Sequence, residues 1–218
     1  MSGTTAARGG GEQDRRDQVV LAAVAAVEEL GPGVGLGEVA ARSGIQRPNL
    51  YRLFTSKEQL DAEVARYAGA QLNAAVRPHL SERGTMAQLV AGVIGAGVAW
   101  ADEHPQLYRL LATQHHRSSG VRIGWDRLLG EFVGAIQSYL AAGGMRAEVP
   151  SGVLASLMGL VDAGIVWWLD HRDETQAAVA VRLSRHVTRI LGDVAEELGL
   201  DIPADLVLSP RPEVGAGL

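Results

Sequence analysis

Residues 38–60 read EVAARSGIQRPNLYRLFTSKEQL, and this stretch decides the fold of the N-terminal region. Two short helices are predicted around its glycine, at about 36–43 and 46–54, because apolar and small residues recur there at helical spacing. Gly44 suits the left-handed position just after a helix, and Ile45 follows as a buried aliphatic residue. Pro48 is tolerated because it falls in the first turn of the second helix. The spacing predicts a helix-turn-helix, with an ordinary corner of two helices as the alternative.

The charge of the chain is acidic overall but basic within this stretch. The formal net charge is −5, yet residues 39–57 hold four positive charges and no negative one. A protein that coats nucleic acid non-specifically carries a positive net charge, so the composition argues against that class. If any part of the chain contacts phosphate, we expect it to be this window.

The rest of the sequence predicts an all-α fold. With 218 residues, 47% of them apolar, the chain is long enough to bury a core. A helix is expected from about residue 12 to Leu30, preceded by a flexible arm at residues 1–11. Residues 201–218 hold three prolines and are expected to form a loosely ordered tail. Between the motif and this tail, apolar periodicity predicts six helices, at about 57–76, 85–102, 105–114, 122–142, 151–170 and 174–199.

The motif resembles the signature of TetR-family transcriptional regulators, which reads approximately I-A-x-x-[AS]-G-V-x-x-x-x-[LI]-Y-x-[HY]-F-x-[SN]-K-x-x-L. The matching positions that make the resemblance specific are Gly44, Tyr51, Phe54, Lys57 and Leu60. The resemblance implies a three-helix DNA-binding domain at residues 12–56. It also implies a six-helix ligand-binding and dimerisation domain at residues 57–200.

Six residues are expected to contact DNA because they match the family's contact positions: Gln46, Arg47, Asn49, Tyr51, Arg52 and Lys57. Within this set, Arg47, Asn49 and Arg52 match the positions that meet base edges, and the other three match phosphate contacts. The chemistry agrees, since Arg can form two hydrogen bonds to guanine and Asn two to adenine. A packing role for the Tyr51 ring remains an alternative.

The sequence departs from the family pattern at two places. Gly35-Leu36-Gly37 stands where a Thr or Ser usually caps the first helix of the motif, which predicts a weaker helix start. Leu53 replaces the more common His or Tyr, which puts only the local phosphate contacts in doubt.

Eight residues, most of them aromatic, are expected to line an effector pocket: Trp100, Tyr108, Gln114, His115, Trp125, Phe132, Asp162 and Trp168. Large rings interrupted by glycines either interdigitate as a tight core or leave a cavity, and both alternatives stay open. Asp162 favours a cavity, because a carboxylate within an apolar helix is costly to bury without a partner. The predicted ligand is a mostly hydrophobic small molecule, which would act through the helix at 57–76.

The helix expected at 151–170 is apolar on all sides, so we expect it to be covered by its own core and by a second chain. Pairing it with the helix at 174–199 across two chains would give a four-helix interface, and two recognition helices would then meet an inverted repeat. The predicted interface residues are Leu154, Met158, Val166, Leu169, Leu183 and Val187.

Rival classes of protein find less support. Gly35 to Ala40 fits G-x-G-x-x-A, but no strand is predicted before it, as a dinucleotide site requires. The chain has no cysteine, and the adjacent His115 and His116 would point about 100° apart on a helix. We therefore expect no enzymatic activity, no cofactor and no metal site. The apolar runs at 86–101 and 153–169 fall short of the roughly 20 residues that cross a bilayer.

These observations predict a ligand-responsive repressor of the TetR type, a homodimer that binds an inverted-repeat DNA operator. No secretory signal is evident, so a cytoplasmic location is expected. The alternative is a helical adaptor, or a small-molecule-binding protein without sequence-specific DNA binding.

Overall fold

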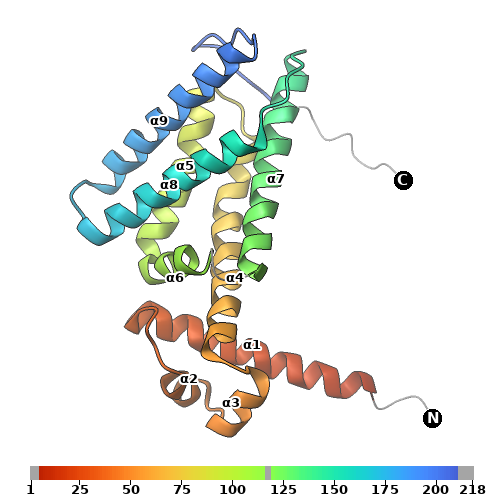
Figure 1. Ribbon diagram of the computed structural model, residues 1–218, viewed down its shortest axis with the longest axis vertical. Helices are drawn as coiled ribbons and strands as arrows, with labels where there is room; N and C mark the ends of the chain where they lie inside the picture. The colour runs from red at the N-terminus through yellow and green to blue at the C-terminus, as the bar shows by residue number, and fades with distance from the viewer. Residues whose placement is uncertain (1–4, 116–118, 211–218) are drawn as a thin grey trace. The chain divides into compact units, whose positions relative to one another are not determined.

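The structure is a computed structural model that describes residues 5–115 and 119–210, with side chains described for 11–114 and 124–210. These residues form nine α-helices and one 3-10 helix, η1, and contain no strand (Figure 1). The helices are α1 Thr5–Leu30, α2 Leu36–Ser43, α3 Arg47–Leu53, α4 Lys57–Val76, η1 Arg77–Ser81, α5 Met86–Glu103, α6 Pro105–His115, α7 Ser119–Ala142, α8 Ser151–His171 and α9 Gln176–Glu197. The predicted all-α class, with three helices and then six more, is confirmed.

The chain divides into two compact units. The first takes the chain up to Ala70 together with His104–Gly124, and the second takes Gln71–Glu103 together with the chain from Trp125 onward. The boundary therefore falls within α4, and α6 belongs to the first unit.

α1 begins inside the segment that the sequence predicts as a flexible arm. Residues 5–11 of that arm are helical, and residues 1–4 lie outside the described part of the chain. Each of the three glycines at 9–11 costs about 1 kcal/mol of helix stability relative to alanine. A helix already formed from Glu12 onward nevertheless extends easily, because each added residue brings a hydrogen bond without a new nucleation step.

The first unit is built around α1, which packs against α2, α3 and α6. The buried stripe of α1 holds Val19, Ala23, Ala26 and Val27, at the spacing of one helix face. The remaining elements contribute apolar side chains that are at most 1% exposed: Val39, Leu50, Phe54, Leu60 and Val64. Helices as short as α2 and α3 are marginal in isolation, so this shared core is what stabilises them.

The turn between α2 and α3 has the predicted geometry. Gly44 follows α2 with a φ of 68°, in the left-handed region that favours glycine. Gln46 precedes α3 in an extended conformation. Pro48 lies in the first turn of α3, where a backbone nitrogen has no hydrogen-bond partner within the helix in any case. The first residue before α2, Gly35, makes no side-chain cap, in agreement with the predicted weak start.

The second unit packs α5 against α8, α9 and η1. α8 and α9 approach closely at Gly164, where a Cβ atom would lie only 2.7 Å from Cδ2 of Leu183. At the corner between these two helices, the Trp168 indole N–H donates to the Glu174 carbonyl at 2.9 Å, and Arg172 stacks over the Trp168 ring. The segment at 201–210 is anchored by an isolated antiparallel bridge between Leu208 and Gly84.

α8 is the single helix within the described ranges that is long and apolar enough to cross a membrane, judged by length and composition alone. Apolar helices in the core of a soluble protein pass the same test. Here only 33% of the most apolar window of α8 is buried within the chain. Much of this helix therefore presents small and apolar side chains outward.

Candidate nucleic-acid interface

The outward face of α3 and its preceding residue carries the predicted base-reading side chains. Leu50 is the buried residue of α3 and fixes the helix against the core. The neighbouring positions Arg47, Asn49 and Arg52 are exposed, as is the capping residue Gln46. Five of the six predicted contact residues are therefore open to solvent, since Tyr51 is also 55% exposed.

Arg47 lies against the first turn of α2. A Cβ atom on Gly37 would lie 2.1 Å from Nη2 of Arg47, so this guanidinium occupies the space that a side chain at residue 37 would fill. Gly35-Leu36-Gly37 departs from the family pattern, and because Gly37 has no side chain, it leaves room for Arg47.

Two of the four positive charges in the window are paired within the protein. Arg42 forms ion pairs with Glu29 of α1 at 2.7 Å and with Glu38 of α2 at 3.0 Å. The hydrogen bond from Arg42 lowers the pKa of Glu29 below its ordinary value. Arg42 therefore holds α2 to α1, and it is not one of the six predicted DNA contacts.

Lys57, the predicted phosphate contact at the start of α4, pairs with Asp61 one turn later. Asp61 is mostly buried, and this burial raises the pKa of its carboxyl group, although the hydrogen bond from Lys57 acts in the opposite direction. Arg47 and Arg52 have no carboxylate partner among the described residues. The unpaired positive charge of the motif is thus concentrated on α3.

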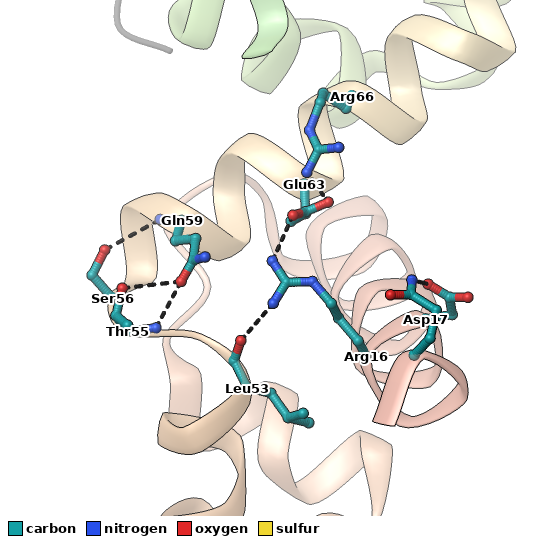
Figure 2. A network of polar contacts seen from close by, with 9 residues as sticks. Arg16, Asp17, Leu53, Thr55, Ser56, Gln59, Glu63 and Arg66 are labelled. Carbon is teal, nitrogen blue, oxygen red and sulfur yellow. Dashed lines mark hydrogen bonds and ion pairs between the residues drawn. The ribbon is translucent and has the colours of Figure 1, made fainter. Parts of the chain in front are cut away.

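Side chains of the turn cap the N-terminus of α4 (Figure 2). The Ser56 hydroxyl accepts from the Gln59 N–H at 3.2 Å, and the Gln59 side chain accepts from the Thr55 N–H at 2.7 Å. Hydrogen bonds from its own backbone N–H and from Ser56 lower the pKa of Glu58 in this first turn. The helix begins at Lys57, where the sequence predicts it.

Arg16 is a functional candidate that no sequence pattern indicates. Its guanidinium donates to the Leu53 carbonyl at 2.6 Å and to Glu63 of α4 at 2.6 Å (Figure 2). It also stacks 4.4 Å from the centre of the Phe54 ring. These partners are 37 to 47 residues away along the chain, so no local pattern reveals them. By contrast, the spacing of four residues could have suggested the Lys57–Asp61 and Arg42–Glu38 pairs.

The eight predicted pocket residues are divided between the two units. Tyr108 and Gln114 belong to the first, and the side chain of His115 lies outside the described residues. The second unit holds Trp100, Trp125, Phe132, Asp162 and Trp168. Within it, Trp100 and Trp168 are buried, whereas the other three are half-buried. Because the Trp168 N–H is already bonded to Glu174, that residue contributes to the α8–α9 corner.

The predicted dimer residues require a correction. Leu154, Leu169, Leu183 and Val187 are all less than 9% exposed within the single chain, so they form its own core and are not accessible to a partner. Met158 and Val166 are half-buried. The apolar periodicity of the two helices was real, but it cannot distinguish the inner face from an outer one when both are apolar. The accessible apolar surface of α8 and α9 lies at other positions: Ala155, Gly159, Ala163, Trp167, Ala177 and Val181.

Comparison with known proteins adds a family and a fold. Residues 20–69 match the family described as bacterial regulatory proteins, tetR family. Among curated protein sequences, none matches the chain. A tetR-family transcriptional regulator from Streptomyces coelicolor is similar in structure, with a TM-score of 0.68, 23% sequence identity and coverage of 86% of both chains.

Two further solved structures have the same fold. A TetR-like transcriptional regulator from a Rhodococcus species gives a TM-score of 0.60 at 19% identity, covering 82% of this chain and 96% of the other. FadR from Bacillus subtilis, a transcriptional regulator solved in complex with stearoyl-CoA, gives 0.62 at 17% identity, covering 80% and 96%. At such identities the likeness shows the fold.

A helix-turn-helix of this geometry on an all-α chain defines a helix-turn-helix regulator. Residues 20–69 match the DNA-binding domain of the tetR family, and the chain as a whole is similar in fold to a solved tetR-family transcriptional regulator.

Proposed function

We propose that this regulator is a repressor that binds an inverted-repeat operator as a homodimer. A mostly hydrophobic small molecule either releases it from DNA or promotes its DNA binding. The observation that carries the proposal is the exposed face of α3, where Arg47, Asn49 and Arg52 stand without carboxylate partners among the described residues. Such side chains read guanine and adenine in the major groove. As a DNA-binding regulator, the protein would act in the cytoplasm.

Dimerisation is supported by the outward faces of α8 and α9. Trp167 is 57% exposed and Val181 64% exposed, and the small residues Gly159 and Ala163 of α8 are also open to solvent. Exposed apolar surface on adjacent helices is typical of a protein interface. A twofold dimer would present two α3 helices about 34–36 Å apart or somewhat more, which calls for an inverted repeat.

An effector site is supported by the residue types of the second unit and by the structural similarity to FadR. Half-buried Trp125 and Phe132 lie in the same unit as Asp162, which combines apolar rings with a polar anchor. FadR, which has the same fold, was solved with stearoyl-CoA, a ligand with a long apolar chain. In this proposal the ligand favours one arrangement of the DNA-binding helices over another, through α4.

Selection of bound sequences from a random DNA pool tests the DNA-binding part. The proposal predicts an enriched inverted repeat bound by two chains. An adaptor or a simple small-molecule-binding protein would enrich no sequence and associate with DNA only weakly. For the effector, a library of hydrophobic ligands should contain members that quench Trp emission and raise the melting temperature. Asp162→Ala should alter their affinity, and a library without any such ligand would contradict this part.

A further inference from the structure

The C-terminal end of α3 poses a structural problem. The helix has seven residues, and the chain leaves it at Phe54 in an extended conformation, without a left-handed glycine to close the last turn. The last carbonyl groups of a helix have no partners within it and carry the negative end of the helix dipole. A helix of this length depends on outside contacts for its orientation.

Arg16 of α1 supplies those contacts with a single guanidinium. One terminal nitrogen, Nη1, donates to the Leu53 carbonyl at the end of α3, and the other, Nη2, donates to Glu63 on α4. The cation stacks on the ring of Phe54, which is fully buried in the link between the two helices. Figure 2 shows the guanidinium between Leu53 and Glu63.

The charges at this site are arranged to keep the bridge formed. The side chains of Arg16 and Glu63 are 25% and 19% exposed, so water screens their attraction only in part. Burial by itself would raise the pKa of Glu63, but the hydrogen bond from Arg16 and the charges of Arg66 and Arg16 lower it below its ordinary value. Glu63 is therefore ionised at neutral pH, and it also pairs with Arg66.

A planar guanidinium is suited to this task, and an ammonium group is not. Arginine presents donors in a fixed fork and stacks on aromatic rings, whereas lysine is a compact point charge. The positive charge also complements the negative end of α3. Nη1 and Nη2 of Arg16 each donate to a partner inside the protein, so we assign this residue to the bridge and not to a DNA phosphate.

We propose that Arg16 is a positioning residue for DNA binding, which fixes the orientation of α3 relative to α4 through its bridge from Leu53 to Glu63. This inference rests on the proposed function, since α3 carries the base-reading residues and α4 the phosphate contact Lys57. Without the bridge, α3 is no longer held in one orientation, and binding has to restore the orientation in which both sets of contacts fit the same DNA segment. The loss weakens binding to all sequences alike and leaves the base preference unchanged.

The test measures DNA affinity and folding in the same full-length variants. The DNA is the duplex that the wild type selects, titrated by fluorescence anisotropy at several salt concentrations, and circular dichroism confirms folding at the assay temperature. We expect Arg16→Gln to weaken binding about tenfold, the effect of losing a charge-assisted hydrogen bond. Arg16→Lys restores the affinity only in part. Glu63→Gln weakens binding less, and the double variant is no weaker than Arg16→Gln alone, because both changes remove one bridge.

Arg15→Gln is the matched control, because it removes the same charge from an exposed neighbour on α1. Its affinity should stay within about twofold of the wild type. The salt dependence of Arg16→Gln should equal that of the wild type, because no phosphate contact is lost.

Three results would overturn the proposal. A folded Arg16→Gln with wild-type affinity would show that the bridge is purely structural. A salt slope reduced by about one in this variant would show that Arg16 contacts a phosphate directly. Should Arg16→Gln not fold, a folded Arg16→Lys and a folded Glu63→Gln that both bind like the wild type would also contradict it. If the wild type selects no DNA sequence, the proposed function is wrong, and so is this inference, which rests on it.

Discussion

α3 and α8 differ in what they leave exposed. α3 has seven residues and buries Leu50, and its outward side chains include two arginines and an asparagine. α8 has 21 residues, and its outward side chains are mainly small or apolar, with Trp167 the largest. Water solvates the first face readily and the second poorly. One chain thus offers a cationic surface that suits a polyanion and an apolar surface that suits another protein.

The first prediction separates the two faces of α8. Leu169→Asp should unfold the protein, since Leu169 is 3% exposed and a buried unpaired carboxylate costs about 4 kcal/mol or more. Ala163→Asp changes an exposed position of the same helix, so the chain should fold but should no longer dimerise. Circular dichroism and light scattering at micromolar concentration give the two readouts. If Ala163→Asp is still a dimer, the dimer interface does not include this face of α8.

The second prediction concerns the α3 surface. Arg47→Ala should cost about 1–3 kcal/mol of binding free energy and relax the preference at one base position. Lys57→Ala should weaken all sequences alike and reduce the salt slope by about one. Titration of single-position variants of the selected duplex distinguishes the two. Identical, sequence-independent profiles for the two variants would contradict the assignment of Arg47 to a base.

The third prediction tests the contact between α8 and α9. Gly164→Ala places a Cβ atom against the buried Leu183 side chain and should lower the free energy of unfolding by about 1 kcal/mol, the cost of overpacking less the gain in helix propensity. Gly95→Ala in α5 is the control, because nothing lies within 4 Å of its Cβ position. It should stabilise the protein by about 0.5–1 kcal/mol. Urea unfolding of both variants gives the values, and a Gly164→Ala variant as stable as the control would show that Leu183 moves aside freely.

The smallest effect is expected at Asp61. Asp61→Asn removes the carboxylate that competes with phosphate for Lys57, so DNA affinity should rise by about two- to fivefold. Asp14→Asn, at an exposed acid of α1, should leave affinity nearly unchanged. A decrease on Asp61→Asn would mean that Asp61 positions Lys57 for DNA.

The same variant gives a test by pH. Because the pKa of Asp61 is raised in the folded state, the folded protein takes up this proton at a higher pH than the unfolded chain. This carboxyl therefore disfavours folding at neutral pH, and the penalty fades as the pH falls through the raised pKa toward its ordinary value of about 3.9. Thermal melts should show that the stability of Asp61→Asn relative to the wild type declines as the pH falls through this range. A constant difference would contradict the assignment.

The sequence predicted the helix-turn-helix to within one residue, because each of its elements is marked by a local signal. Gly44 follows the end of α2, and Thr55 and Ser56 cap the start of α4. The exposed residues of α3 follow from the position of Leu50 alone. At α8 the same kind of periodicity predicted the helix but not its faces, because an apolar residue such as Leu154 or Ala163 fits either side. Which of them is buried depends on α5 and α9, and only the tertiary packing settles it.

The long-range polar contacts could not be predicted from the sequence either. The partners of Arg16 lie on other elements, so nothing near residue 16 distinguishes it from its neighbour Arg15. The early start of α1 was missed for the opposite reason, because glycines at 9–11 predict an irregular segment that helix propagation overrides.

Whether the α3 face reads a DNA sequence can be decided by one comparison of affinities. The wild type and Arg47→Ala are titrated, at physiological salt, with the selected inverted repeat and with a scrambled duplex of the same composition. The wild type should prefer the selected duplex by about a thousandfold or more, and Arg47→Ala should lose about ten- to a hundredfold of that preference. Equal affinity of the wild type for the two duplexes would contradict sequence reading by α3.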